Sequence, residues 1–177
     1  MPLHRAFLRT MVAAQRTNPM DTFERLVDLF RSGNASFRVI EHAAEGRSDT
    51  VAAIRGTRVE QGAKAIVCAI PVGAETRYVV AVVPGDRRVD VKAVARLVGG
   101  KKGSFAAPAV AQMVTGCAIG AIPPVSFDDT LALIVDGDFL DREDEIAFNA
   151  GRLDRSIVIR AADFRRIVQP QEAAIAV

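Results

Sequence analysis

The sequence of 177 residues is short of the residue types on which many enzymes and nucleic-acid binders depend. It has no Trp and one Tyr, which argues against an aromatic platform that stacks several bases. Its two cysteines, Cys68 and Cys117, are too few and too far apart for a disulfide framework or a zinc site. Of the two histidines, His42 is the one that a Ser-His-Asp triad would have to use, and no obvious nucleophile lies beside it in the sequence.

Long apolar runs and the common catalytic signatures are absent as well. No run of 18 apolar residues occurs, so the sequence predicts no membrane span. There is no GxSxG elbow, no P-loop, no GxGxxG after a strand and no HExxH. Residues 1–20 contain no clean signal-peptide core, because Arg5, Arg9 and Arg16 interrupt their apolar stretches. We interpret residues 1–20 as an extension or a misassigned start, with a frayed helix as the alternative.

The overall composition is that of one globular domain. Half of the residues are apolar and 25% are charged, and a chain of this length buries roughly 70% of its unfolded surface. The net charge of +2 is too small for a protein that holds duplex nucleic acid by counterion release alone. It leaves room for a local basic rim, for which Arg87, Arg88, Lys101 and Lys102 are candidates if they are not simply solvated surface. Cys68 and Cys117 are expected to be buried, reduced thiols in a cytoplasmic protein.

Hydrophobic periodicity and turn residues divide the chain into strands and helices. A hairpin is predicted from the two β-rich runs 64–70 and 77–83, because Pro71 and Gly73 lie between them. Ser48 or Asp49 is expected to cap a short helix that ends at Gly56. The other predicted helices cover 21–33, 90–98, 108–115 and 161–168, and the other strands cover 37–42, 131–136, 145–151 and 156–160. The tail after Pro170 is expected to be loose. This pattern predicts an α+β domain with a mixed, mostly antiparallel sheet flanked by helices.

Three segments contain residues that could carry chemistry, and each also has a purely structural explanation. Lys64 opens an apolar strand, either as a solvated charge or as a fixed ammonium that faces a phosphate or a developing negative charge. The loop from Thr115 to Pro124 contains Gly116 and Gly120, and it is either an irregular connection or an oxyanion hole made of backbone N–H groups. In FNAGR, Asn149 and Gly151 either orient a polar substrate or form a tight turn.

The order of these segments resembles the YbaK family of aminoacyl-tRNA editing domains, and most of all its freestanding, prolyl-tRNA-editing-like branch. The resemblance rests on EGRSDT, QGAK, TGCAIGAIPP and FNAGR, and it covers residues 21–170, between the extension of 1–20 and a tail of 171–177. It implies a single YbaK-like domain that hydrolyses the ester of mischarged tRNA in the cytoplasm. No cofactor and no metal are implied. The implied partners are mischarged tRNA and, in addition, an aminoacyl-tRNA synthetase, and no membrane is involved.

The resemblance also implies roles for individual residues. Lys64 matches the lysine at the mouth of the pocket, and Gly116 and Gly120 belong to the loop whose backbone holds the aminoacyl carbonyl. The residues expected to contact the substrate are His42, Arg47, Ser48, Asp49, Ala121, Ile122, Pro123, Asn149 and Gly151. Some branches carry a carboxylate where this chain has Ser156, so no acid is transferred to that position.

The expected reaction needs a positioned water and a stabilised oxyanion, and a donor in such a hole contributes about 3 kcal/mol. The ribose hydroxyl and a bound water are alternative proton relays. Small amino acids such as Ala, Ser, Thr and Gly are the expected substrates. The active site of a synthetase discriminates between amino acids that differ by one methylene group by only about 1–3 kcal/mol, so a second site that hydrolyses the wrong product is needed. Two other hypotheses are a binding module of the same fold without turnover, and a thiol enzyme that uses Cys68 or Cys117.

Overall fold

Two β-sheets with helices around them form the described part of the protein. The structure, a computed structural model, describes residues 21–177, so the predicted extension lies outside the described residues. The first sheet has the order β1-β7-β6, with β1 at Phe37–Glu41, β6 at Glu145–Asn149 and β7 at Arg155–Arg160. The second sheet has the order β4-β2-β3-β5-β8. Its strands are β2 (Ala63–Val72), β3 (Glu75–Pro84), β4 (Ser104–Phe105), β5 (Ala132–Asp136) and β8 (Gln171–Ala173).

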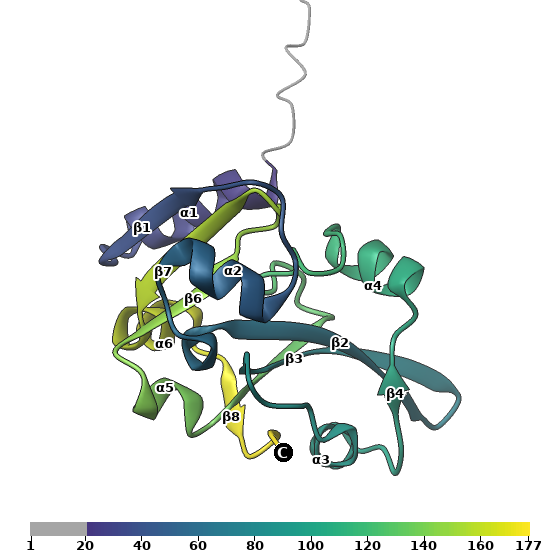
Figure 1. The fold of residues 1–177 in the computed structure, drawn as a ribbon. Helices are drawn as coiled ribbons and strands as arrows, with labels where there is room; N and C mark the ends of the chain where they lie inside the picture. Colours follow the sequence, from purple (N-terminus) through teal and green to yellow (C-terminus); the bar gives the residue numbers. More distant parts are fainter. Residues whose placement is uncertain (1–20) are drawn as a thin grey trace, which may run out of the picture.

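The predicted α+β class with mostly antiparallel strands is confirmed, but the strands are divided between two sheets (Figure 1). Four of the six strand pairings are antiparallel, and β3–β5 and β5–β8 are parallel. The predicted hairpin of β2 and β3 is present with Lys64 opposite Val83. Each sheet buries an apolar face in a core that both sheets share.

The main core lies between the two sheets and is completed by two amphipathic helices. These are α1 (Thr22–Ser32), which buries Leu26 and Phe30, and α6 (Ala161–Val168), which buries Phe164. Phe148 from β6 makes edge-on contacts with both of these aromatic rings, with ring centroids 6.3 and 6.4 Å apart. Such aromatic pairs stabilise a core beyond the area that they bury.

The central strand β3 is buried on both of its faces. Its side chains alternate, so that Val80 and Val82 enter the main core while Val79, Ala81 and Val83 face a second cluster. That second cluster is covered by α3 (Val91–Leu97) and by the C-terminal segment, both of which lie below β2 and β3 in Figure 1. Burial on both faces explains why RYVVAVV reads as a continuous apolar run.

Capping and turn residues in the sequence predicted helices α2 and α4 correctly, but the predicted cap of α2 is wrong. Helix α4 spans Pro108–Thr115 and is followed by Gly116 in the left-handed region, as predicted. Helix α2 spans Ser48–Arg55 and ends at Gly56, also left-handed. The prediction that Ser48 or Asp49 caps α2 is wrong, because both lie inside the helix and the cap position is taken by Arg47, whose side chain makes no capping hydrogen bond. A short helix, α5 (Phe139–Arg142), and a 3-10 turn at Val59–Gln61 were not predicted.

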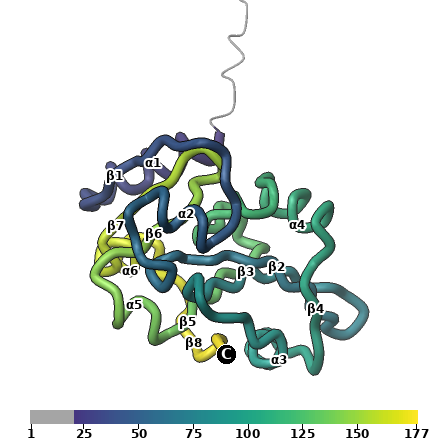
Figure 2. The backbone as a smooth tube through the Cα atoms, viewed as in Figure 1, coloured from purple at the N-terminus to yellow at the C-terminus, as the bar shows by residue number. Residues whose placement is uncertain are grey.

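The prediction of a loose tail after Pro170 is wrong. Residues 171–173 form β8 beside β5, and the side chain of Ile175 is fully buried in the second cluster. The buried carboxylate of Asp136 accepts hydrogen bonds from the backbone N–H groups of Ile175 and Ala176, both at 3.0 Å. Figure 2 shows the chain end turning in against the body of the protein. The tail is therefore part of the fold.

Candidate active site

One small pocket brings together residues from four separate segments. It lies between α2, the start of β2, the end of β6 and the loop of residues 116–124, and its volume is about 60 Å³. Five of the twelve predicted site residues line it: Ser48, Lys64, Gly120, Ile122 and Asn149. This volume exceeds the roughly 10–15 Å³ that a single water needs, so the pocket has room for a small ligand group.

The ammonium of Lys64 is fixed at the edge of this pocket. Its Nζ donates hydrogen bonds to the backbone carbonyls of Gly85, at 3.2 Å, and Arg87. Burial lowers the pKa of Lys64; the charge of Asp86 opposes this effect and that of Arg88 adds to it. An ammonium has three donors, so Lys64 keeps one for a ligand.

The opposite wall of the pocket is made of backbone. Gly120 has a φ of 84°, and a Cβ atom added to it would lie 2.9 Å from the Cα atom of Gly46. Such a contact is too short for any side chain, so these two glycines fix how closely their loops approach. In the described part of the chain, the backbone N–H groups of Gly120 and Ile122 donate to no other backbone carbonyl or side chain. Neither N–H group is thus committed to another acceptor within the described residues.

Asn149 connects the two loops that form this wall. Its Nδ2 donates to the carbonyls of Glu45 and Gly120, both at 2.8 Å. Its Oδ1 accepts from Nη2 of Arg55 at 2.8 Å and from the hydroxyl of Ser156 at 3.0 Å. All of these bonds are made within the protein. Asn149 lines the pocket as predicted, but it orients the pocket loops, and its amide has no hydrogen left for a substrate.

Arg55 is a pocket residue that the sequence analysis did not identify. Its side chain is nine-tenths buried, with 9% exposed, and its Nε donates to the hydroxyl of Ser156 at 2.8 Å. Burial lowers the pKa of Arg55 to about 10, so the guanidinium remains charged at neutral pH. A signal for it existed in the sequence, because Arg55 follows the buried Val51 by one helical turn and therefore shares its face.

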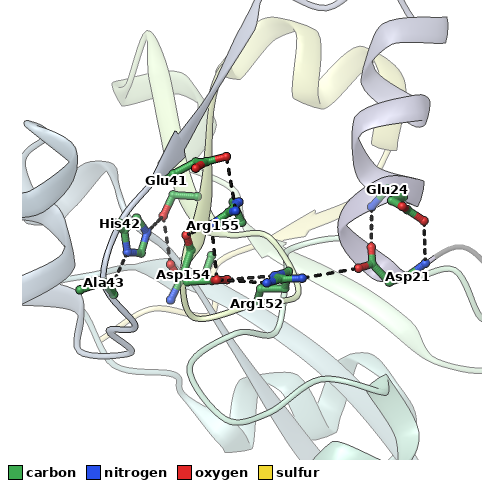
Figure 3. A network of polar contacts seen from close by, with 10 residues as sticks. Asp21, Glu24, Glu41, His42, Ala43, Arg152, Asp154 and Arg155 are labelled. Carbon is green, nitrogen blue, oxygen red and sulfur yellow. Dashed lines mark hydrogen bonds and ion pairs between the residues drawn. The ribbon is translucent and has the colours of Figure 1, made fainter.

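His42 does not line the pocket, but it is hydrogen-bonded to Ser156, which in turn bonds to the pocket residues Arg55 and Asn149. Its Nε2 is 2.7 Å from the Ser156 hydroxyl, and its Nδ1 is 2.8 Å from the carbonyl of Ala43. Figure 3 shows His42 beside a surface network in which Arg152 holds Asp154 through two hydrogen bonds of 2.9 and 3.0 Å. This pairing lowers the pKa of Asp154 to about 2. The FNAGR segment thus contributes Asn149 to the pocket and Arg152 to the surface.

The other predicted residues do not line the pocket. Arg47 and Asp49 form an exposed ion pair at 3.0 Å, and Gly116 terminates α4. Gly151 donates its N–H to the carbonyl of Ala121 at 2.9 Å, and this hydrogen bond connects the FNAGR segment to the loop of residues 116–124. Pro123 lines a neighbouring cavity of about 210 Å³.

Neither cysteine has the environment of a nucleophile. Cys68 is completely buried, and burial raises its pKa to about 11, while burial also raises the pKa of Cys117. The prediction of two buried, reduced thiols is confirmed. A catalytic thiolate needs a lowered pKa, so these environments argue against the thiol-enzyme hypothesis.

The comparison with known proteins decides the family. The model of the aminoacyl-tRNA editing domain matches residues 42–167. The chain belongs to this family. Within the editing-domain family, it is similar to the multifunctional Ser/Thr-tRNA deacylase ProXp-y of Escherichia coli K12 and to that of E. coli O157:H7. With each it shares 43% identity over 150 residues, which cover 85% of this chain and 90% of the relative.

Solved structures of this editing domain's fold agree. A proposed trans-editing enzyme for prolyl-tRNA synthetase is 25% identical, with a TM-score of 0.72 over 89% of this chain and 98% of the other. A hypothetical protein of 18% identity has the same fold, with a TM-score of 0.76 over 87% of this chain and 100% of the other. The predicted family and fold are thus confirmed. Within residues 21–177, no helix combines the length and apolarity needed to cross a bilayer. The same residues contain no cluster of three or more His, Cys, Asp or Glu side chains able to hold a metal ion.

Proposed function

We propose that this editing domain is a freestanding deacylase that removes serine and threonine from mischarged tRNA. Hydrolysis of aminoacyl-tRNA is the activity of the family to which the chain belongs, and the printed name of its E. coli relative specifies Ser/Thr-tRNA. The observation that carries the proposal is the 43% identity to that relative over 85% of the chain. The small pocket volume of about 60 Å³ is consistent with a small amino acid as the substrate.

The proposed mechanism uses backbone donors and one lysine. The ester carbonyl lies against the free N–H groups of Gly120 and Ile122, which stabilise the oxyanion formed when water attacks. Lys64 uses its remaining donor to hold the substrate beside them. The ester is already activated, so orientation of the water and stabilisation of the oxyanion are sufficient for a large acceleration.

The test is a deacylation assay with tRNAs charged with Ser, Thr, Ala, Pro and Cys. The wild-type protein is expected to release Ser and Thr fastest, and Lys64→Ala is expected to lower the rate by about 100-fold or more, as loss of an electrostatic donor does. Lys92→Ala is the matched control, because Lys92 is exposed, does not line the pocket and is not one of the basic-rim candidates. Binding of charged tRNA without hydrolysis would instead favour the binding-module hypothesis.

A second part of the proposal concerns recruitment in the cytoplasm. With a net charge of +2, the chain has little general attraction for tRNA, so docking on an aminoacyl-tRNA synthetase would supply local concentration. Co-migration of the purified protein with a synthetase in size-exclusion chromatography tests this part separately. Deacylation that is equally fast with and without added synthetase would contradict it.

A further inference from the structure

Arg55 is a buried cation without a buried anion beside it. Its two hydrogen-bonded partners, Ser156 and Asn149, are both neutral, and no carboxylate of the described residues pairs with it. Neutral partners satisfy the geometry of a guanidinium but do not neutralise its charge. Buried charges are normally paired, so an unpaired one beside a cavity indicates a ligand of opposite charge.

The remaining nitrogen of this guanidinium has access to the pocket. Nη1 has no partner among the described residues, and it is not one of the fully enclosed side-chain atoms that lack a hydrogen bond. Because Arg55 lines the pocket and is otherwise enclosed, the pocket is the accessible space that Nη1 meets. Two N–H donors are therefore available there.

The pocket as a whole is positively charged. Lys64 supplies a second cation with one free donor, and none of the residues that line the pocket is Asp or Glu. A guanidinium matches the two oxygens of a carboxylate, and the pocket volume of about 60 Å³ favours a small ligand. A small carboxylate fits this combination of charge, donor geometry and size.

We propose that Arg55 and Lys64 bind the carboxylate of the free amino acid that the deacylation releases. This inference rests on the proposed function. In the reaction, water oxygen bonds to the carbonyl carbon, the bond from that carbon to the ribose oxygen breaks, and the ribose oxygen takes a proton. The acid then loses its own proton. The group that enters the pocket as a neutral ester leaves it as an anion.

Two consequences follow from this change of charge. The site binds free serine or threonine through the carboxylate, so the released amino acid inhibits the enzyme. The same cations favour the negative tetrahedral intermediate over the neutral ester, which makes Arg55 a further catalytic residue.

The experiment compares L-serine with serinol (2-amino-1,3-propanediol), the achiral analogue that has a hydroxymethyl group in place of the carboxylate. Binding to the wild-type protein is measured by calorimetry without tRNA, and inhibition is measured in the deacylation assay. Serine is expected to bind at least about 10-fold more tightly than serinol, in line with the strength of charge-assisted hydrogen bonds. Equal binding of the two compounds by the wild-type protein would overturn the proposal without any variant.

Variants then assign the effect to Arg55. Arg55→Gln is expected to abolish the preference for serine, while Arg55→Lys keeps part of it. Arg96→Gln is the control, because Arg96 is exposed on α3. A preference that survives in folded Arg55→Gln would contradict the assignment. Carboxylate-dependent binding without hydrolysis of any charged tRNA would refute the proposed function and leave the carboxylate site standing.

Discussion

Two buried polar side chains hold this protein together in the same way at opposite ends of the fold. At the pocket, the Asn149 amide donates to the carbonyls of Glu45 and Gly120, which belong to two different loops. At the C-terminus, the Asp136 carboxylate accepts from the N–H groups of Ile175 and Ala176. Both side chains are 5% exposed, and both bind two backbone groups far away in the sequence.

The two side chains differ in their position relative to the pocket and in their further hydrogen-bond partners. The oxygen of Asn149 is occupied by Arg55 and Ser156, so the amide is fixed from both sides and belongs to the wall of the pocket. Asp136 lies beside the second apolar cluster and does not line the pocket. One connection therefore serves both the fold and the chemistry, and the other serves the fold alone.

The largest effect is expected for Asn149→Ala. The change leaves two partly buried carbonyls and the buried Arg55 guanidinium with fewer partners, which costs about 2–4 kcal/mol of unfolding free energy. It also releases the loop that carries the oxyanion donors, and a displacement of about 1 Å there lowers kcat/KM roughly 100-fold. Urea titration and deacylation kinetics measure the two effects. Retention of wild-type kcat/KM in a folded variant would refute the positioning role of Asn149.

Asp136→Ala is expected to separate stability from activity. Loss of the carboxylate leaves one buried and one partly buried N–H group without acceptors, so the unfolding free energy falls by about 2–4 kcal/mol. At a temperature at which the variant is folded, kcat/KM should stay within about two-fold of the wild-type value. A large drop in kcat/KM would mean that the two ends of the molecule are coupled.

Alkaline pH is expected to affect the pocket, because Lys64 loses its proton there, and to leave the hydrogen bonds of Asp136 unchanged. Because burial lowers the pKa of Lys64, its ammonium is lost, and deacylation falls, at a lower pH than for a lysine with the ordinary value of 10.5. Between the lowered value and 10.5 the unfolded chain holds the proton and the folded one does not, so this group's contribution to stability rises with pH. Removal of the opposing charge by Asp86→Asn should move the alkaline limb of the activity profile to lower pH, and Arg88→Gln should move it to higher pH.

The smallest effect is expected in the rate at which the two cysteines are alkylated. Cys117 reports on local opening near the pocket, and Cys68 reports on local opening near the C-terminus. Cys117 lies in the pocket loop and Cys68 in the cluster that contains Ile175. Both should react slowly with iodoacetamide in the native protein, since both are buried with raised pKa values. Asn149→Ala should speed the labelling of Cys117 a few-fold and Asp136→Ala that of Cys68, as read by mass spectrometry. Equal acceleration of both thiols in either variant would show that the two ends open together.

The sequence predicted those parts of the molecule that depend on local signals. Pro108 and Gly116 bound α4 as expected, and the turn at Gly73 produced the predicted hairpin. The motifs also identified Lys64 and Gly120 as pocket residues, because these motifs keep the same order along the chain as in the resembled family.

The errors concern residues whose partners are distant in the sequence. Arg55 is separated by 94 residues from Asn149 and by 101 from Ser156, so its position on the buried face of α2 indicates burial but not its polar partners. The tail lacks periodicity, and Asp136, its anchor, precedes Ile175 by 39 residues. Asp49 is a good capping residue in isolation, but the helix begins before it. In each case a contact made in the folded state overrides a local preference.

The contact between Gly46 and Gly120 limits how this editing domain can be redesigned or can evolve. Their two backbones touch, so at this contact there is no side chain that could be enlarged or trimmed to admit another amino acid. The adjustable positions lie on the other sides, at Val51 of α2 and Ala65 of β2, which also line the pocket. A library that varies these two positions while conserving both glycines is the natural route to a proofreading enzyme of altered selectivity.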